Sequence, residues 1–341
     1  APEFGGELPV SVLAEEILTP GKGQIKALVT SCGNPVLSTP NGQQLDQALA
    51  GLDFMVSIDF YLNETSRHAD VILPPTCFVE HDHYDLVFLH LAVRNVARYN
   101  GPIVEPEANT LHDWQIYNEL AQRYARRAWA LEKGSTVQRI KGMASRAFMA
   151  RVSPQRLLSM GLKRSKSTIN MDQLLAKPEG IDLGPLKPSL ITALTKKKRR
   201  VNLMPAAIRQ ALPLVEHSFV TPAPARSQLK LIGRRDGRSN NSWMHNSARL
   251  VSGKNRCVLW MHPEDAQSRQ LQDGQTVAVQ SRVGQIQVPI HVTDQIRHGV
   301  VSLPHGWGHN RPGIQLGIAQ AHAGVSINDL TDDQLTDRIS G

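Results

Sequence analysis

The order of apolar runs in the first 75 residues limits the possible folds of this chain most strongly. Short apolar runs cover residues 25–32, 54–58 and 71–73, which is the length of buried strands. Between the first two runs, apolar residues recur at helical spacing behind Asn41, a favourable N-cap, and residues 63–69 indicate a short polar helix or turn. This strand–helix–strand–helix–strand order predicts a parallel sheet with helices packed on it.

Two further patterns divide the rest of the chain. A helical pattern begins near Asp113, and residues 175–228 are rich in proline and basic residues, which predicts a long, largely irregular connector. Beyond residue 228 the apolar period becomes two, which predicts a small β-barrel. Its expected elements are strands at residues 229–232, 257–261, 276–281, 285–292 and 299–304, and a helix that starts at His262-Pro263. We therefore expect three parts, which are residues 1–175, 176–227 and 228–341.

The net charge of +8 is concentrated in the middle of the chain. Residues 121–230 carry 22 Lys and Arg against 5 Asp and Glu, whereas residues 1–120 carry 5 against 16. The basic run at residues 196–200 lacks aromatic residues for base stacking, so a solvated surface or contact with an acidic neighbour is favoured over nucleic-acid binding. No apolar run reaches the roughly 18 residues of a membrane span. We expect no nucleic-acid partner, no membrane span and a cytoplasmic location, with any membrane association arising through a partner.

The cysteine pattern argues against a metal or disulfide framework. Cys32, Cys77 and Cys257 are far apart and form no C-x-x-C pair. An odd, sparse count suits a reducing compartment. The Glu80–His83 segment could place two imidazoles on one side of an extended chain, but it has no further ligand nearby, so a polar loop is favoured. We expect no metal site in this chain.

Polar residues follow two of the predicted strands at the edge where parallel sheets bind ligands. Gly33-Asn34 offers close backbone approach and an amide, and Asp59 offers a carboxylate for a ribose diol or a guanine N–H edge. The alternative is that Gly33-Asn34-Pro35 is only a turn and Asp59 only a helix cap. No G-x-G-x-x-G or P-loop motif is present, which argues against ordinary NAD and P-loop nucleotide binding.

Two segments in the second half have the composition of ligand-binding loops. Residues 234–246 combine arginines, amides, a hydroxyl and an imidazole beside Trp243, and such groups bind pyrophosphate or a heterocycle. Residues 305–309 place two glycines around Trp307 between two histidines. The alternatives are a surface loop pinned by Trp243 and a tight packed turn.

These residues resemble the molybdopterin oxidoreductases of the dimethyl sulfoxide reductase family. In the first part the resemblance rests on the series Gly-Asn-Pro, Asp, Glu-Thr and Ala-Asp-Val-Ile-Leu-Pro, which occurs in this order between residues 33 and 74. In the second part it rests on Ser242–Asn246, Met261–Ala266, Asp273-Gly274, Gly299–Gly306 and Asn328–Thr331. The resemblance covers nearly the whole chain, with the basic middle least diagnostic. Formate dehydrogenase-like and nitrate reductase-like members are the most similar.

The resemblance implies a fold and cofactors. Residues 1–175 would be the later portion of an α/β domain with a partial Rossmann-like parallel sheet, and residues 228–341 a double-psi β-barrel that binds the molybdopterin dinucleotide. The family holds two molybdopterin guanine dinucleotides on one molybdenum or tungsten. Its iron–sulfur cysteines and metal ligand precede the Gly-Asn-Pro series, so we expect them outside this chain. We therefore expect the C-terminal portion of an oxidoreductase, inactive alone and completed by the N-terminal half of the same protein.

The resemblance also implies partners and site residues. The partners would be a small-molecule substrate, formate- or nitrate-like, and an electron-transfer partner. The alternatives are a non-catalytic nucleotide- or partner-binding module and a basic nucleic-acid binder built on residues 121–230. By motif match, the cofactor-binding residues would be Gly33, Asn34, Pro35 and Asp59 at one guanosine diphosphate arm, Thr65 and Asp70 in support of that arm, and Ser242, Trp243, Met244, His245, Asn246, His309 and Asn328 on the barrel side, with no catalytic residue in the chain.

Overall fold

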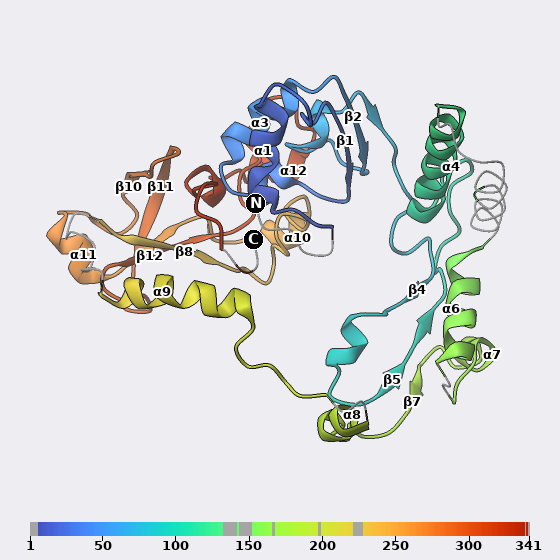
Figure 1. Ribbon diagram of the computed structural model, residues 1–341. Coiled ribbons are helices and arrows are strands. Elements are labelled where there is room, and N and C mark those ends of the chain that lie inside the picture. Colours follow the sequence, from blue (N-terminus) through green and yellow to red (C-terminus); the bar gives the residue numbers. More distant parts are fainter. Residues whose placement is uncertain are drawn as a thin grey trace. The chain divides into compact units, whose positions relative to one another are not determined.

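The three predicted N-terminal strands form a parallel sheet (Figure 1). Strands β1 (Ala27–Ser31), β2 (Phe54–Ile58) and β3 (Val71–Ile72) lie in that order, and both pairings are parallel, as predicted. Helix α3 (Gly42–Ala50) connects β1 to β2, and the Asn41 side chain accepts a hydrogen bond from its first turn. The predicted α/β order of this region is confirmed.

Helices α1 (Leu13–Leu18) and α3 cover the parallel sheet with apolar side chains. The short helix α2 (Pro35–Ser38) follows β1, and the 3-10 helices η1 (Val10–Val12) and η2 (Ser66–His68) complete this region. The helical spacing seen in the sequence of α3 therefore marks a buried face. The buried core consists of Ala14, Ile17, Val36, Leu45, Ala48, Leu49 and Met55.

The period-two region after residue 228 forms a five-stranded mixed sheet. Its order is β10-β11-β9-β12-β8, with parallel β11–β9 and β12–β8 pairs and antiparallel β10–β11 and β12–β9 pairs. All five predicted strands and the predicted helix are present, whereas closure of the sheet into a double-psi barrel remains a prediction. The elements are β8 (Lys230–Arg234), β9 (Leu259–Met261), α11 (Pro263–Ser268), β10 (Thr276–Gln280), β11 (Gln285–Val292) and β12 (Val300–Pro304).

The sheet residues of this second region alternate between buried and exposed positions. In β11, Ile286, Val288 and Ile290 are buried while the residues between them are more exposed. They pack with Leu259 and Leu303 in one core. The alternation explains why the sequence pattern identified these strands so well. Short helices α10 (Ala248–Val251) and α12 (Gly317–Ala321) and the 3-10 helix η4 (Ile327–Asp329) lie in the connecting segments.

The structure describes residues 6–131, 142, 152–165, 168–196, 199–220, 228–337 and 339.

Backbone contacts divide the chain into two units. One unit joins residues 1–72 to residues 202–341, so it holds both sheets described above, and the other contains residues 73–201. The boundaries predicted at residues 175 and 227 are a different division and remain predictions.

The unit formed by residues 73–201 is mainly helical, with two small antiparallel ladders. Helix α4 starts at Asp113, as predicted, and Ala97, Tyr99, Ile169, Met171 and Leu174 form a small core. Among the described residues, no helix is long and apolar enough to cross a membrane. The elements are β4 (His83–Tyr84), η3 (Phe88–Leu91), β5 (Val96–Ala97), β6 (Tyr99–Asn100), α4 (Asp113–Leu131), α6 (Pro154–Arg164), α7 (Met171–Leu175) and β7 (Ile181–Asp182).

The segment predicted as a largely irregular connector, residues 175–228, contains two helices among its described residues, and its role as a connector remains a prediction. Helices α8 (Leu190–Lys196) and α9 (Ala206–Val220) lie within it. Residues 206–212 are rich in alanine, leucine and other good helix formers, and Pro213 is accommodated inside α9. The proline content therefore did not indicate these two helices. Lys197 and Lys198 of the basic run lie outside the described residues.

An ion-pair cluster centred on Asp46 of α3 links segments that are distant in sequence. The Asp46 carboxylate accepts hydrogen bonds from Arg67 at 2.5 and 2.7 Å and from Arg311 at 2.8 Å, and it lies 2.6 Å from His68 Nε2. Arg311 also binds Asp329 at 2.9 Å. Burial works to raise the pKa of Asp46, but the hydrogen bonds and positive charges around it outweigh burial and lower the pKa to about 2. The cluster therefore holds an ionised carboxylate at the junction of α3 and the C-terminal segment.

Candidate functional site

The Gly-Asn-Pro turn joins β1 to α2 at the carboxyl edge of the parallel sheet. Pro35 occupies the first position of α2, where its missing N–H costs no hydrogen bond. The buried Asn34 side chain donates from Nδ2 to Glu64 Oε2 at 2.7 Å and accepts at Oδ1 from Thr65 Oγ1 at 2.8 Å. Gly33 has no positive φ, so the turn itself does not require a glycine there, and close approach of its backbone to a ligand stays a prediction. The structure thus brings the predicted residues Gly33, Asn34, Pro35 and Thr65 together.

Asp59 follows β2 at the same edge and anchors the turn after it. Its Oδ1 accepts from the Tyr61 N–H and its Oδ2 accepts from Asn63 Nδ2, both at 3.0 Å. Burial raises the pKa of Asp59, and these hydrogen bonds offset only part of that effect. Each carboxylate oxygen can accept a further hydrogen bond, so a contact to ribose or guanine remains a prediction.

Asp70 lies apart from the other predicted residues. Its carboxylate accepts a hydrogen bond from the Met55 N–H at 2.7 Å, at the start of β2. Asp59 comes after the other end of the same strand, and four residues of strand span roughly 13 Å. The structure therefore places Asp70 at the other end of β2 from Asp59, where it binds the strand backbone, and its support of the nucleotide arm stays a prediction.

A buried row of side chains leads away from the Gly-Asn-Pro turn. Glu64 Oε1 lies 3.1 Å from His309 Nδ1, His309 Nε2 lies 2.8 Å from His245 Nδ1, and His245 Nε2 lies 2.7 Å from Ser239 Oγ. All four side chains belong to residues that are at most 1% exposed. We call Glu64, His309, His245 and Ser239 the buried relay.

The titration behaviour of the buried relay follows from its surroundings. Burial works to raise the pKa of Glu64, but hydrogen bonds from His309 and Asn34 outweigh it and hold the pKa below its usual range. Burial, together with His309 and Arg256 nearby, lowers the pKa of His245 to about 4. At neutral pH the relay therefore contains an ionised carboxylate and a neutral His245.

Two glycines allow the loops that carry the buried relay to approach one another. At Gly306, φ is +89° and a Cβ would lie 2.0 Å from the Asn241 carbonyl oxygen. At Gly308, a Cβ would lie 2.7 Å from a methyl carbon of Leu37. A side chain would therefore meet backbone at Gly306 and the buried Leu37 side chain at Gly308, which explains the two glycines around Trp307 in the sequence.

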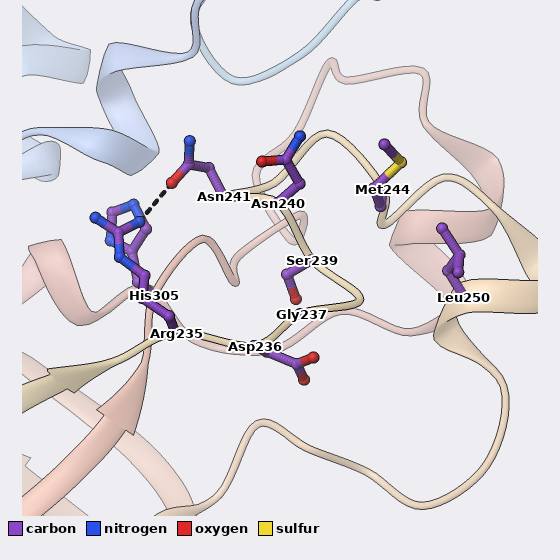
Figure 2. Close-up of a pocket in the computed structure, with 9 residues that line it drawn as sticks. All are labelled: Arg235, Asp236, Gly237, Ser239, Asn240, Asn241, Met244, Leu250 and His305. Carbon is purple, nitrogen blue, oxygen red and sulfur yellow. Dashed lines mark hydrogen bonds between the residues drawn. The ribbon is translucent and has the colours of Figure 1, made fainter. Parts of the chain in front are cut away.

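A pocket of about 530 Å³ lies beside the end of the buried relay. Figure 2 shows Arg235 and His305 on one side of it and Met244 and Leu250 on the other. This volume is typical of small-molecule sites. We call it the loop pocket. Its lining residues are Arg235, Asp236, Gly237, Ser239, Asn240, Asn241, Met244, Leu250 and His305.

Charged groups around the loop pocket favour an anion. Arg235 donates to the Asn241 side-chain oxygen, and the Asp236 carboxylate accepts from Arg256 Nε at 2.6 Å. The negative charge on the wall is thus paired, while Arg235 keeps its positive charge at the rim. Burial and Arg235 lower the pKa of His305. Arginine, amides and glycine backbone are groups that bind pyrophosphate.

The remaining predicted barrel-side residues have several different positions. Trp243 is exposed and Ser242 is half-buried. The Asn246 side-chain oxygen accepts from the N–H groups of Ile318 and Ala319 at 3.1 and 3.2 Å, so it stabilises the first turn of α12. Asn328 Nδ2 donates to the Leu37 carbonyl at 2.7 Å, which ties η4 to α2. Met244 lines the loop pocket, whereas His245 and His309 lie in the buried relay.

The prediction from sequence missed Glu64 and Ser239 as site residues. Glu64 stands beside the predicted Thr65 in the Glu-Thr motif, but nothing in its spacing indicates that it is buried and bonded to a histidine 245 residues away. Ser239 and Arg235 lie within the loop whose composition suggested ligand binding. The composition of this loop could therefore have indicated Arg235 as a site residue. Its hydrogen bond to Asn241 becomes visible only in the folded structure.

Two other histidine-containing groups lie outside the buried relay and the loop pocket. Asp82 accepts a hydrogen bond from the Tyr99 hydroxyl, and Glu80 accepts from the Cys77 N–H at 2.6 Å, so the Glu80–His83 segment makes local contacts. A different group has spacing suited to a metal ion: ligand atoms of His262, Glu264 and His298 lie within 4.8 Å of one another. Glu264 and His298 are exposed, and this group was not predicted.

Comparisons with known proteins agree with the geometry. The molybdopterin oxidoreductase family profile matches residues 6–123, and the molydopterin dinucleotide binding domain profile matches residues 229–341. The chain is 26% identical over 302 residues to the F420-dependent formate dehydrogenase subunit alpha of Methanocaldococcus jannaschii, covering 88% of this chain and 41% of that subunit. It is 26% identical over 291 residues to the assimilatory nitrate reductase catalytic subunit of Bacillus subtilis, covering 84% of this chain and 38% of that subunit.

A solved structure has the same fold. Acetylene hydratase from Pelobacter acetylenicus superposes with a TM-score of 0.59 at 16% sequence identity, covering 95% of this chain and 42% of that chain. The present chain thus spans about two fifths of the length of these similar proteins. Its mixed α/β fold, its dinucleotide-binding region and its relatives agree, and the chain belongs to the dimethyl sulfoxide reductase family of molybdopterin oxidoreductases.

Proposed function

We propose that this chain is the C-terminal portion of an oxidoreductase that holds two molybdopterin guanine dinucleotides on one molybdenum or tungsten. The reaction is a two-electron oxidation or reduction of a small substrate, formate- or nitrate-like. The bound metal and pterins supply the redox chemistry, and the residues described above bind and orient them. Relatives named as a formate dehydrogenase and a nitrate reductase support this substrate class.

The loop pocket is the observation that carries the proposal. Arg235 and the amides of Asn240 and Asn241 surround a space of about 530 Å³ in the region matched by the dinucleotide-binding profile. A pyrophosphate fits these donors, because Arg235 and the amide groups offer N–H bonds to its oxygens. Met244 and Leu250 add apolar surface on the other side for a ring or sugar.

The turn at the edge of the parallel sheet is proposed to bind the second guanosine arm. Asn34 and Asp59 are buried at the carboxyl ends of β1 and β2, where α/β sheets bind ligands. The Asp59 carboxylate would accept from the ribose hydroxyls or the guanine N–H edge. Thr65 would hold Asn34 in place through the hydrogen bond described above.

The finer features of the assembly belong to the same proposal. The five-stranded sheet would close as a double-psi barrel. The N-terminal half of the protein would contribute the iron–sulfur cluster and the metal ligand, and an electron-transfer partner would complete the reaction. The enzyme would act in the cytoplasm, and this chain alone would be inactive.

Binding of GDP-mannose tests the loop pocket, because its pyrophosphate is esterified at both ends as in the cofactor. Calorimetry should show binding to the chain, and Arg235→Gln should weaken it by the loss of a charge-assisted hydrogen bond, about 1.5–3 kcal/mol or roughly tenfold to hundredfold. Arg238→Gln is the matched control, since Arg238 is exposed in the same loop and does not line the pocket. Equal affinity of the two variants would reject the assignment of Arg235.

Asp59→Ala tests the second arm in the same way. We expect the variant to lose affinity for guanosine nucleotides at the turn after β2. Unchanged binding would reject a ligand contact by Asp59 and leave it as the anchor of the turn.

A further inference from the structure

Two histidines and a glutamate meet at one edge of the five-stranded sheet. Strands β9 and β12 are antiparallel, with Met261 opposite Val301, so the residues after β9 lie beside the residues before β12. His262 and Glu264 follow β9, and His298 precedes β12. The strand pairing thus brings together three side chains that are distant in sequence.

The three side chains have the spacing and the chemistry of metal ligands. Each offers one ligand atom, and these atoms lie within 4.8 Å of one another. Two imidazoles and a carboxylate form a set that binds zinc in proteins and leaves a fourth position open. Zinc–ligand distances near 2.1 Å place tetrahedral ligand atoms roughly 3.4 Å apart. Glu264 and His298 are exposed, so a small rotation of their side chains closes the remaining distance.

A buried carboxylate holds His298 in an orientation suited to a metal. Asp265 accepts a hydrogen bond from the Gly299 N–H at 2.7 Å, and its Oδ2 lies 3.3 Å from His298 Nδ1. Histidines that bind metals commonly donate their second ring N–H to a carboxylate in this way, which leaves the other nitrogen for the ion. Arg269 shares the charge of Asp265 at 3.2 Å, and Glu264 adds a further negative charge that favours a cation.

His262 must give up one weak contact to bind an ion through Nε2. Its Nδ1 accepts a hydrogen bond from the Glu264 N–H at 3.3 Å, at the start of α11. Coordination through Nε2 places the ring proton on Nδ1 and breaks this bond. The bond is long, and Glu264 is exposed, so water can take the place of the lost acceptor. The contact therefore opposes metal binding only weakly.

We propose that His262, Glu264 and His298 bind one divalent transition-metal ion, with Zn²⁺ as the best match. Imidazole ligands suit Zn²⁺ and similar ions, whereas Ca²⁺ and Mg²⁺ take oxygen ligands almost exclusively. The bound ion ties the first turn of α11 to the segment before β12. Its open position accepts water or a donor atom from another molecule.

This site is separate from the loop pocket. Strands β8 and β12 are parallel, and the pocket residues Arg235 and His305 follow their carboxyl ends. His298 precedes the other end of β12, and the five residues of this strand span roughly 16 Å. The metal site therefore does not depend on the proposed function, and its test is independent of nucleotide binding.

The test is calorimetry with zinc chloride at neutral pH, on the chain after dialysis against a chelator. We expect one Zn²⁺ to bind per chain. His298→Gln and Glu264→Gln should each weaken the affinity at least tenfold to about hundredfold, because changes even one shell further out cost this much. Both residues are exposed, so neither substitution should disturb the fold. His262→Asn should weaken binding similarly, and asparagine remains a favourable N-cap for α11.

Hydrogen exchange locates the ion. Adding Zn²⁺ should slow amide exchange at the start of α11 and in the segment before β12. His291→Gln is the matched control, because His291 pairs with the Asp273 carboxylate at 3.3 Å on the exposed surface but does not belong to the group of three. This variant should keep the full affinity for Zn²⁺.

Three results would overturn the inference. The first is the lack of saturable binding of one Zn²⁺ per chain. The second is an affinity of His298→Gln equal to that of the unmodified chain, which would remove His298 from the ligand set. The third is protection from exchange confined to segments away from α11 and β12, which would place the ion elsewhere.

Discussion

The ion-pair cluster around Asp46 makes a quantitative prediction about stability. Replacing Asp46 with asparagine keeps the size of the side chain but removes the charge that Arg67 and Arg311 share. The Asp46 side chain is 16% exposed and the two arginines are 17% and 15% exposed, so water screens the interaction only in part. We expect Asp46→Asn to lower the free energy of unfolding substantially at neutral pH.

The magnitude follows from the pKa of Asp46. Its pKa falls from 3.8 to about 2 in the folded chain, and each pKa unit corresponds to about 1.4 kcal/mol, so ionised Asp46 contributes about 2 kcal/mol. Leaving the partly buried Arg67 without a carboxylate partner adds to this, up to the 3–5 kcal/mol typical of broken buried pairs, whereas Arg311 keeps its bond to Asp329. We therefore expect a loss of about 2–4 kcal/mol. Because the folded pKa is lowered, this contribution is present above pH 3.8 and is lost as pH falls through 2.

Urea unfolding followed by tryptophan fluorescence measures this loss. Asp53→Asn is the control, since Asp53 pairs with Lys26 at 3.5 Å with both side chains more than 60% exposed, and such a pair contributes at most about 1 kcal/mol. The difference between Asp46→Asn and the unmodified chain should shrink as pH approaches 2. A cost for Asp46→Asn no larger than that of Asp53→Asn would refute the role of the cluster.

Three further predictions follow from individual residues. Gly306→Ala should lower the free energy of unfolding more than Gly299→Ala and should abolish GDP-mannose binding. Gly306 and Gly299 both have positive φ, but only at Gly306 would a Cβ meet backbone. Equal effects of the two substitutions on stability would contradict this close approach. Lowering the pH from 6.5 to 4 should reduce the free energy of unfolding by about 3 kcal/mol through His245, because this histidine binds a proton more readily in the unfolded chain. His245→Gln should flatten this part of the dependence of stability on pH, measured by urea unfolding. An unchanged dependence would contradict the lowered pKa of His245. Burial raises the pKa of the Cys257 thiol to about 11, so Cys257 should react with a thiol reagent at pH 8 only after unfolding. The exposed Cys32 should react at once. Rapid reaction of Cys257 in the folded chain would contradict its burial.

Much of the fold could be predicted from periodicity. The strand at 54–58 and the strand at 285–292 match β2 and β11, since alternating or continuous apolar runs of that length form few other structures. Helix α9 could not be predicted in this way, because Pro213 and the surrounding basic residues suggested a connector, and helix propensity outweighed them.

The site was only partly predictable, because its central contacts join residues far apart in sequence. Composition pointed to the loops at residues 234–246 and 305–309, and the motif pointed to Asn34 and Thr65, which the structure places in the candidate site. The bond between Glu64 and His309 spans 245 residues, and no local pattern indicates such a pair. Asp70 belongs to the motif but lies at the other end of β2 from Asp59, so its support of the nucleotide arm stays a prediction.

The most direct test of the proposed function is cofactor analysis of the full-length protein purified from its own cells. Metal analysis should find molybdenum or tungsten, and mild acid hydrolysis should release two molecules of GMP per metal atom. A full-length protein that is correctly folded, yet contains neither metal nor guanine nucleotide, would contradict the proposal that this chain binds a molybdopterin guanine dinucleotide.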